Sequence, residues 1–151
     1  DYAPVVALAL NYFVYMVTLI FSPAITNFKK QFQISAICHL INYAVYIPDL
    51  KGDWGLIMGI IGALFGGYGA AIYWVSQGGY MMKLFKMYGI KTNEEGKYFG
   101  ITNAIVYGSS FFGAIVTTFG LGLFGSQIYF SILTVLALVS WAVCTFFLDS
   151  L

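Results

Sequence analysis

The sequence predicts an all-α integral membrane protein, a bundle of several transmembrane helices. Of its 151 residues, 60% are hydrophobic and only 9% are charged, whereas about 25% of the residues in a soluble domain are charged. No charged residue falls in 2–28, 31–48, 54–82 or 98–148, and a helix needs about 20 apolar residues to cross a bilayer. The composition therefore excludes a soluble enzyme, a nucleic-acid-binding protein and a disulfide-rich secreted module.

Breaks in these apolar runs divide the chain, taken as a single domain over 1–151, into five predicted spans. The first ends before Pro23, the second ends at Pro48, and the glycine-rich stretch 120–127 separates the fourth from the fifth. Residues 83–97 form the one extended hydrophilic loop. The predicted spans are about 3–21, 33–47, 54–82, 98–121 and 128–148. A β-barrel is disfavoured, because its strands alternate apolar and polar residues over about 9–11 positions.

The lysines indicate how the spans are oriented. The chain has seven Lys and no Arg. Five alternating spans place Lys29, Lys30 and the four lysines of 83–97 on one side, together with the C-terminus, and Lys51 on the other. An excess of Lys in short loops marks the cytoplasmic side or its equivalent, such as a mitochondrial matrix. We therefore expect the N-terminus outside and the C-terminus inside, in a plasma, endomembrane or mitochondrial inner membrane.

Small and neutral polar residues recur on one face of several spans, at the spacing of three and four that a helix requires. Such faces favour close packing between membrane helices; the alternative is a polar cavity that binds a small-molecule solute. In the third span the face comprises Gly55, Gly59, Gly62, Gly66 and Gly69, with Gln77 returning to it. In the fourth it comprises Gly100, Asn103, Tyr107, Ser110, Ala114 and Thr117. A lesser version in the second comprises Ser35, His39, Asn42 and Tyr46.

The sequence contains no pattern typical of catalysis or of a bound cofactor. His39 is the only histidine, so a site with several histidine ligands is excluded. All acidic residues fall at span ends or in loops, whereas a proton relay needs a carboxylate inside the membrane. Residues 66–69 (Gly-Gly-Tyr-Gly) are similar to a potassium selectivity filter, but they lie within a long helical run. We predict no catalytic residues, metal site or cofactor.

One stretch of sequence is more specific than composition. The third span ends in Trp-x-x-Gln-Gly-x-Tyr, and Gly-x-Tyr-Phe-Gly-Ile follows after the charged loop. This pairing resembles the Unc-ninety-three-like branch of the major facilitator superfamily. Residues 22–27, ahead of Lys29 and Lys30, are similar to that branch's loop between its second and third helices. The residues matching the motif are Trp74, Gln77, Gly78, Tyr80, Tyr98, Phe99 and Gly100.

The resemblance implies that the five spans correspond to helices two to six of the N-terminal half of a facilitator. It also implies a regulator, a partner of potassium channels or a trafficking chaperone, which acts through contacts with other membrane protein subunits. The alternative is a fragment of a solute transporter, which would need two such halves around a central site. We also expect the sequence to begin partway through a longer protein or after processing, since Asp1 is not preceded by a Met.

Overall fold

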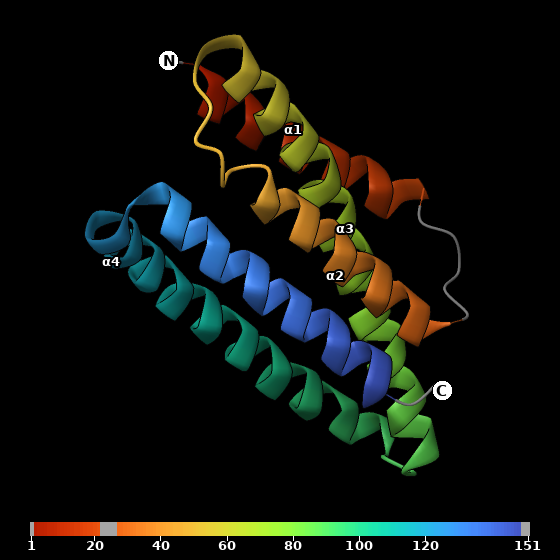
Figure 1. Cartoon of the computed structure of the whole chain (residues 1–151). Coiled ribbons are helices and arrows are strands. Elements are labelled where there is room, and N and C mark those ends of the chain that lie inside the picture. Colours follow the sequence, from red (N-terminus) through yellow and green to blue (C-terminus); the bar gives the residue numbers. More distant parts are fainter. Residues whose placement is uncertain (1, 22–26, 149–151) are drawn as a thin grey trace.

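The computed structural model describes residues 2–21 and 27–148, and within these ranges it contains only helices and the turns between them (Figure 1). The helices are α1 (Ala3–Phe21), α2 (Phe28–Ala44), α3 (Gly52–Met87) and α4 (Thr92–Phe146). The all-α prediction is confirmed for this part of the chain. Three helices, α1, α3 and α4, are long and apolar enough to cross a membrane, which is compatible with a membrane protein.

Helix α4 consists of two arms that run in opposite directions. Its backbone is non-helical at Gly125, where φ is 75° and ψ is 167°. Glycine alone adopts this conformation readily, because a Cβ would clash with the backbone. Figure 1 shows the ribbon turning back here, so that residues 92–124 (the first arm) and 126–146 (the second arm) run in opposite directions. The predicted break at 120–127 thus corresponds to a reversal at a single glycine.

The central helix of the bundle is α3, which packs against both α1 and α2, while α2 also packs against α4. The second arm makes this last contact. The amide of Gln33 on α2 donates a hydrogen bond of 3.1 Å to Thr145 Oγ1, which in turn donates to the carbonyl oxygen of Trp141. Nearer the Gly125 reversal, the rings of Tyr46 and Phe130 lie 5.0 Å apart.

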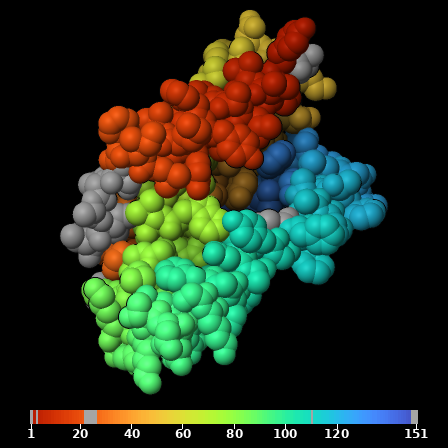
Figure 2. All heavy atoms as spheres, turned by 180° about the vertical axis from the view of Figure 1, so that it is seen from behind, coloured from red at the N-terminus to blue at the C-terminus, as the bar shows by residue number. Residues whose placement is uncertain are grey.

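The first arm is attached to the rest of the bundle chiefly near its two ends. At its start, the rings of Tyr98 and Phe99 contact Phe85 of α3 at centroid distances of 5.8 and 5.3 Å. Near the reversal, Thr117 Oγ1 and the hydroxyl of Tyr129 lie 2.6 Å apart. Figure 2 shows the face on which α1 and the first arm lie apart, with a hollow between them at whose floor other helices are visible.

Helix α2 begins earlier and ends earlier than the predicted span 33–47. Asn27 caps it, accepting a hydrogen bond of 3.0 Å from the backbone N–H of Lys30, as a short polar side chain does at a helix start. Residues 28–33, which include two lysines and two glutamines, therefore form its first turns. The residues of the predicted loop at 22–26 lie outside the described part of the chain.

The predicted hydrophilic loop 83–97 is mostly helical, which corrects the sequence interpretation. Helix α3 continues to Met87, and α4 begins at Thr92. The connection is a glycine C-cap: Gly89 has φ of 64°, and the N–H of Ile90 donates to the carbonyl oxygen of Phe85 at 2.9 Å. This Schellman arrangement satisfies carbonyls that would otherwise lack partners. The polar composition of 83–97 suggested a loop, but the end of α3 and the start of α4 lie within it, because a helix can extend past the apolar part of a span.

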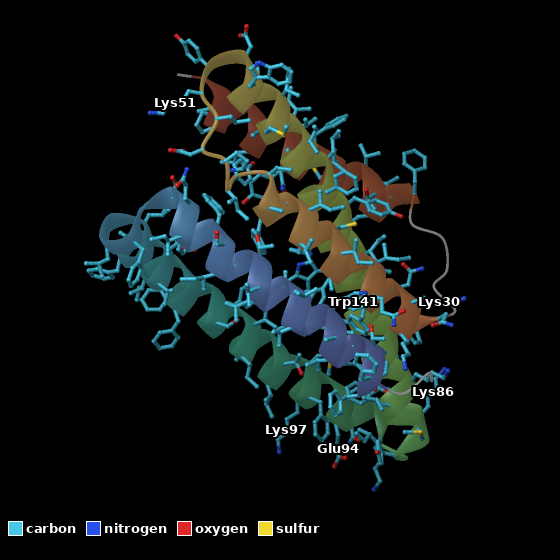
Figure 3. All side chains as sticks on the ribbon, in the orientation of Figure 1. Lys30, Lys51, Lys86, Glu94, Lys97 and Trp141 are labelled. Atoms are coloured by element: carbon cyan, nitrogen blue, oxygen red, sulfur yellow. The ribbon has the colours of Figure 1, made fainter. Side chains whose placement is uncertain are left out.

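Charged residues gather at the two ends of the bundle. Figure 3 shows Lys30, Lys86, Glu94 and Lys97 near one end, and Lys51 near the other. The end with Lys30 is the one where α2 begins, α3 ends and α4 begins. Of the labelled lysines, Lys51 therefore lies apart from the other three.

Candidate functional site

The glycine face of α3 lies against α1 and α2. A Cβ added at Gly59 would lie 3.5 Å from the Cβ of Ala7 on α1. A Cβ at Gly62 would lie 2.8 Å from Val45 Cγ2, and one at Gly69 would lie 2.6 Å from Cys38 Cβ. Both of the latter distances are shorter than real side chains tolerate, so glycine lets the neighbouring helices approach α3 closely.

Two asparagines converge on the middle of this face. A Cβ at Gly66 would lie 2.7 Å from the Asn11 Nδ2 of α1 and 2.9 Å from the Asn42 Cγ of α2. The structure thus brings polar side chains from both neighbouring helices to one glycine. Sequence reasoning included Asn42 but missed Asn11, although Asn11 is the one amide side chain in the apolar run 3–21 and so could have been found.

Where α2 faces Gly69 of α3, Ser35 and His39 form a small hydrogen-bond network. The Ser35 hydroxyl is buried and donates to the carbonyl oxygen of Gly69 at 2.8 Å. His39 Nδ1 lies 2.8 Å from the carbonyl oxygen of Ser35. A carbonyl can only accept, so Nδ1 carries the proton, and the neutral ring keeps Nε2 as an acceptor. The network links α2 to α3 and fixes the tautomer of the histidine.

Ser35 and His39 line a cavity of about 340 Å³ between α2, α3 and the second arm of α4. Aromatic and aliphatic side chains form most of its wall, and hydroxyl and thiol groups complete it. Its lining residues are Phe32, Ser35, Ala36, His39, Tyr43, Tyr73, Leu133, Leu136, Ala137, Ser140 and Cys144. None of them is Asp, Glu, Lys or Arg. Sequence reasoning missed the contribution of the second arm, although the small residues Ala137, Ser140 and Cys144 have the spacing of three and four that places them on one helix face.

The side-chain oxygens of Gln77 and of its neighbour Ser76 are buried and have no hydrogen-bond partner among the described residues. Neither Gln77 Oε1 nor Ser76 Oγ makes a hydrogen bond there, and Ser76 is 0% exposed. Buried polar atoms are usually paired, since an unpaired one costs about 1–3 kcal/mol. Gln77, which the sequence places on the glycine face of α3, thus has a side-chain oxygen that accepts no hydrogen bond from the described residues.

The polar face predicted in the fourth span does not join that of α3. Asn103 and Tyr107 lie on the exposed surface of the first arm, Tyr107 with 71% of its surface accessible. A Cβ added at Gly100 would meet no described atom within 4 Å. The side chain of Ser110 lies outside the described part. Among the side chains of this face that the structure describes, Thr117, close to the reversal, reaches Tyr129.

The residues that carry the family resemblance fall into two aromatic groups. Tyr80 makes edge-to-face contacts with Phe28 and Phe32 of α2 at centroid distances of 6.1 and 6.0 Å. Trp74 contacts its neighbour Tyr73 in the same way. Tyr98 and Phe99 contact Phe85 across the turn between α3 and α4, whereas Gly78 lies in open space. The two halves of the motif therefore make separate contacts, one between α3 and α2 and one between α3 and the start of α4.

Among the described residues, no group of three or more His, Cys, Asp or Glu side chains could hold a metal ion. In the comparisons with known proteins, no family model, no curated protein and no solved structure matches the chain. The polar interior and the exposed arm therefore have to be interpreted from their chemistry.

Proposed function

We propose that this chain is a non-enzymatic, multi-pass membrane protein that acts through contacts with other membrane protein subunits, as a regulator or accessory subunit. In this proposal α1, α2, α3 and the two arms of α4 form five membrane spans, which correspond to half of an Unc-ninety-three-like facilitator. The surface of the first arm is the observation that carries the proposal.

The first arm has two exposed faces of opposite character. Tyr107 and Phe112 are 71% and 67% exposed, and five residues of helix at about 100° each place them about 140° apart. Ile105 and Val116 accompany Phe112 on an apolar face that suits lipid. Asn103 accompanies Tyr107 on the other, where a polar amide facing hydrocarbon would be unfavourable. Small and polar residues on a membrane helix are typical of contacts with another helix.

The resemblance to a facilitator also supports contacts between the first arm and further membrane helices. It implies that the spans belong to one half of a facilitator, whose faces are covered by further helices in the whole fold. The hollow beside the first arm (Figure 2) is compatible with such a covering helix. The lysines at one end of the bundle (Figure 3) would give the complex a fixed orientation.

Photo-crosslinking tests this proposal. Benzoylphenylalanine replaces either Tyr107 or Phe112, an aromatic pair of similar exposure on opposite faces of one helix. In membranes of cells that contain the full protein, we expect the position 107 probe to give one discrete crosslinked protein and the position 112 probe to give lipid adducts. The same partner should co-purify in fixed stoichiometry after mild detergent extraction. A monodisperse protein without a partner, or equal crosslinking from both positions, would contradict the proposal.

A second candidate function is that of a solute transporter of which these residues are a part. The buried acceptor of Gln77, which lacks a partner among the described residues, favours it, because transport sites offer polar groups inside the membrane. Uptake by the reconstituted full-length protein should then fall in the Gln77→Leu and Asn103→Leu variants. Unchanged uptake in both variants would remove these residues from a transport site.

A further inference from the structure

We propose that the cavity between α2, α3 and the second arm binds a small uncharged molecule with a flat apolar body and one hydrogen-bond donor, such as a phenol. This inference concerns the interior of the bundle and does not depend on the partner contacts of the first arm. It rests on the hydrogen-bond acceptor of His39, on the lack of Asp, Glu, Lys and Arg among the lining residues and on the volume of the cavity.

The acceptor is His39 Nε2. Because Nδ1 donates to the carbonyl oxygen of Ser35 at 2.8 Å, the neutral ring has one polar atom left, and that atom can only accept. The Ser35 hydroxyl is already committed to Gly69, so it cannot donate to the ring. A ligand bearing an O–H or N–H group would supply the proton that Nε2 needs.

The wall of the cavity selects against charge and in favour of a flat ring. None of its lining residues is Asp, Glu, Lys or Arg, so an ionised ligand would lose its hydration without gaining a partner. Phe32, Tyr43 and Tyr73 supply aromatic surface, on which another ring can stack or pack edge to face. The volume of about 340 Å³ lies near the lower end of the range of ligand pockets, which suits a molecule of one or two rings.

A matched pair of probes tests the inference on the unaltered chain. 2-Naphthol has the required donor, and 2-methoxynaphthalene has the same rings without it. Binding of each is measured by fluorescence titration of the full chain in nanodiscs, with the signal of empty nanodiscs subtracted. We expect saturable binding of 2-naphthol and about tenfold weaker binding of the ether, since the ether offers no donor to His39 Nε2. Equal affinities, or no saturable binding of either probe, would overturn the inference.

Three variants locate the site. His39→Phe keeps a ring but removes the acceptor, and it should lower the affinity for 2-naphthol to that for the ether. Ala36→Leu narrows the cavity and should weaken both probes, whereas Ala104→Leu, on the exposed surface of the first arm, should weaken neither. Retained 2-naphthol affinity in a folded His39→Phe or Ala36→Leu variant would place binding elsewhere and overturn the inference. If these variants do not fold, as judged by helical circular dichroism, the probe pair on the unaltered chain decides alone.

Discussion

At the scale of single residues, two buried serines on facing helices differ in one respect that matters for stability. Ser35 of α2 is 2% exposed and donates a hydrogen bond of 2.8 Å to the carbonyl oxygen of Gly69. Ser76 of α3 is 0% exposed, and its hydroxyl has no partner among the described residues. The Ser35 hydroxyl links two helices, while the Ser76 hydroxyl is buried without a hydrogen bond to offset the loss of its hydration.

Replacing each serine by alanine separates these effects. We expect Ser35→Ala to lower the free energy of unfolding by about 0.5–1.5 kcal/mol, because it removes a buried interhelical hydrogen bond. Ser76→Ala should change it by less than about 0.5 kcal/mol or raise it, since an unpaired buried hydroxyl is unfavourable. Unfolding of the chain in mixed micelles by increasing fractions of SDS measures both. A loss in Ser76→Ala as large as that in Ser35→Ala would mean that the Ser76 hydroxyl has a partner.

At the scale of helices, the packing of α3 depends on where a glycine faces a neighbour. Gly69 and Gly78 both lie within α3. A Cβ at Gly69 would lie 2.6 Å from Cys38 Cβ and 3.2 Å from the carbonyl oxygen of Ser35, whereas one at Gly78 would meet no described atom within 4 Å. Substitution at one position must therefore displace α2, while substitution at the other affects α3 alone.

The variants Gly69→Ala and Gly78→Ala form a matched pair. We expect Gly69→Ala to destabilise the fold by about 1–3 kcal/mol, the usual cost of forcing extra atoms into a packed interface. Gly78→Ala should stabilise it by about 0.5–1 kcal/mol, because alanine loses less backbone entropy than glycine in a helix. Thermal unfolding in one detergent compares them. Similar changes in both variants would show that α2 does not pack on Gly69 as described.

The element boundaries show which signals in the sequence were sufficient. Helix α1 has the bounds of the predicted span 3–21, since the apolar run leads directly into the polar stretch around Pro23. The early start of α2 was missed because Lys29 and Lys30 suggested a loop, although Asn27 supplies a cap. Helix α3 runs to Met87, beyond the end of the predicted span 54–82, since a helix can continue past the apolar run.

The site was predicted only where a face of one helix meets a second helix. The glycines of α3 could be identified from spacing alone, and the structure places Gly59, Gly62, Gly66 and Gly69 at contacts with α1 or with α2 and the turn that follows it. The polar face of the first arm has the same spacing, yet Asn103 and Tyr107 are exposed. Spacing identifies which residues share a face, but the partner of that face depends on how distant segments pack.

At the scale of the whole molecule, the distribution of charge gives the bundle two unlike ends. Six of the seven lysines occur at the starts of α2 and α4 or near the end of α3, while Lys51 precedes α3. Figure 3 shows Lys30 and Lys86 toward one end and Lys51 toward the other. The reversal at Gly125 divides α4 into two arms. The five proposed spans are these two arms together with α1, α2 and α3.

Cysteine accessibility tests this arrangement directly. In single variants Lys30→Cys, Lys51→Cys and Lys86→Cys, made with Cys38 and Cys144 replaced by alanine, a membrane-impermeant maleimide is applied to sealed vesicles of known orientation. We expect Cys at positions 30 and 86 to react from the cytoplasmic or matrix side, where lysine-rich short loops are retained, and Cys at 51 to react from the opposite side. A charged residue near an interface is solvated on one side only, because carrying it through hydrocarbon is costly. Labelling of positions 30 and 86 from opposite sides would require an odd number of crossings between them instead of the two proposed for α2 and α3, which contradicts five spans and with them the correspondence to half of a facilitator.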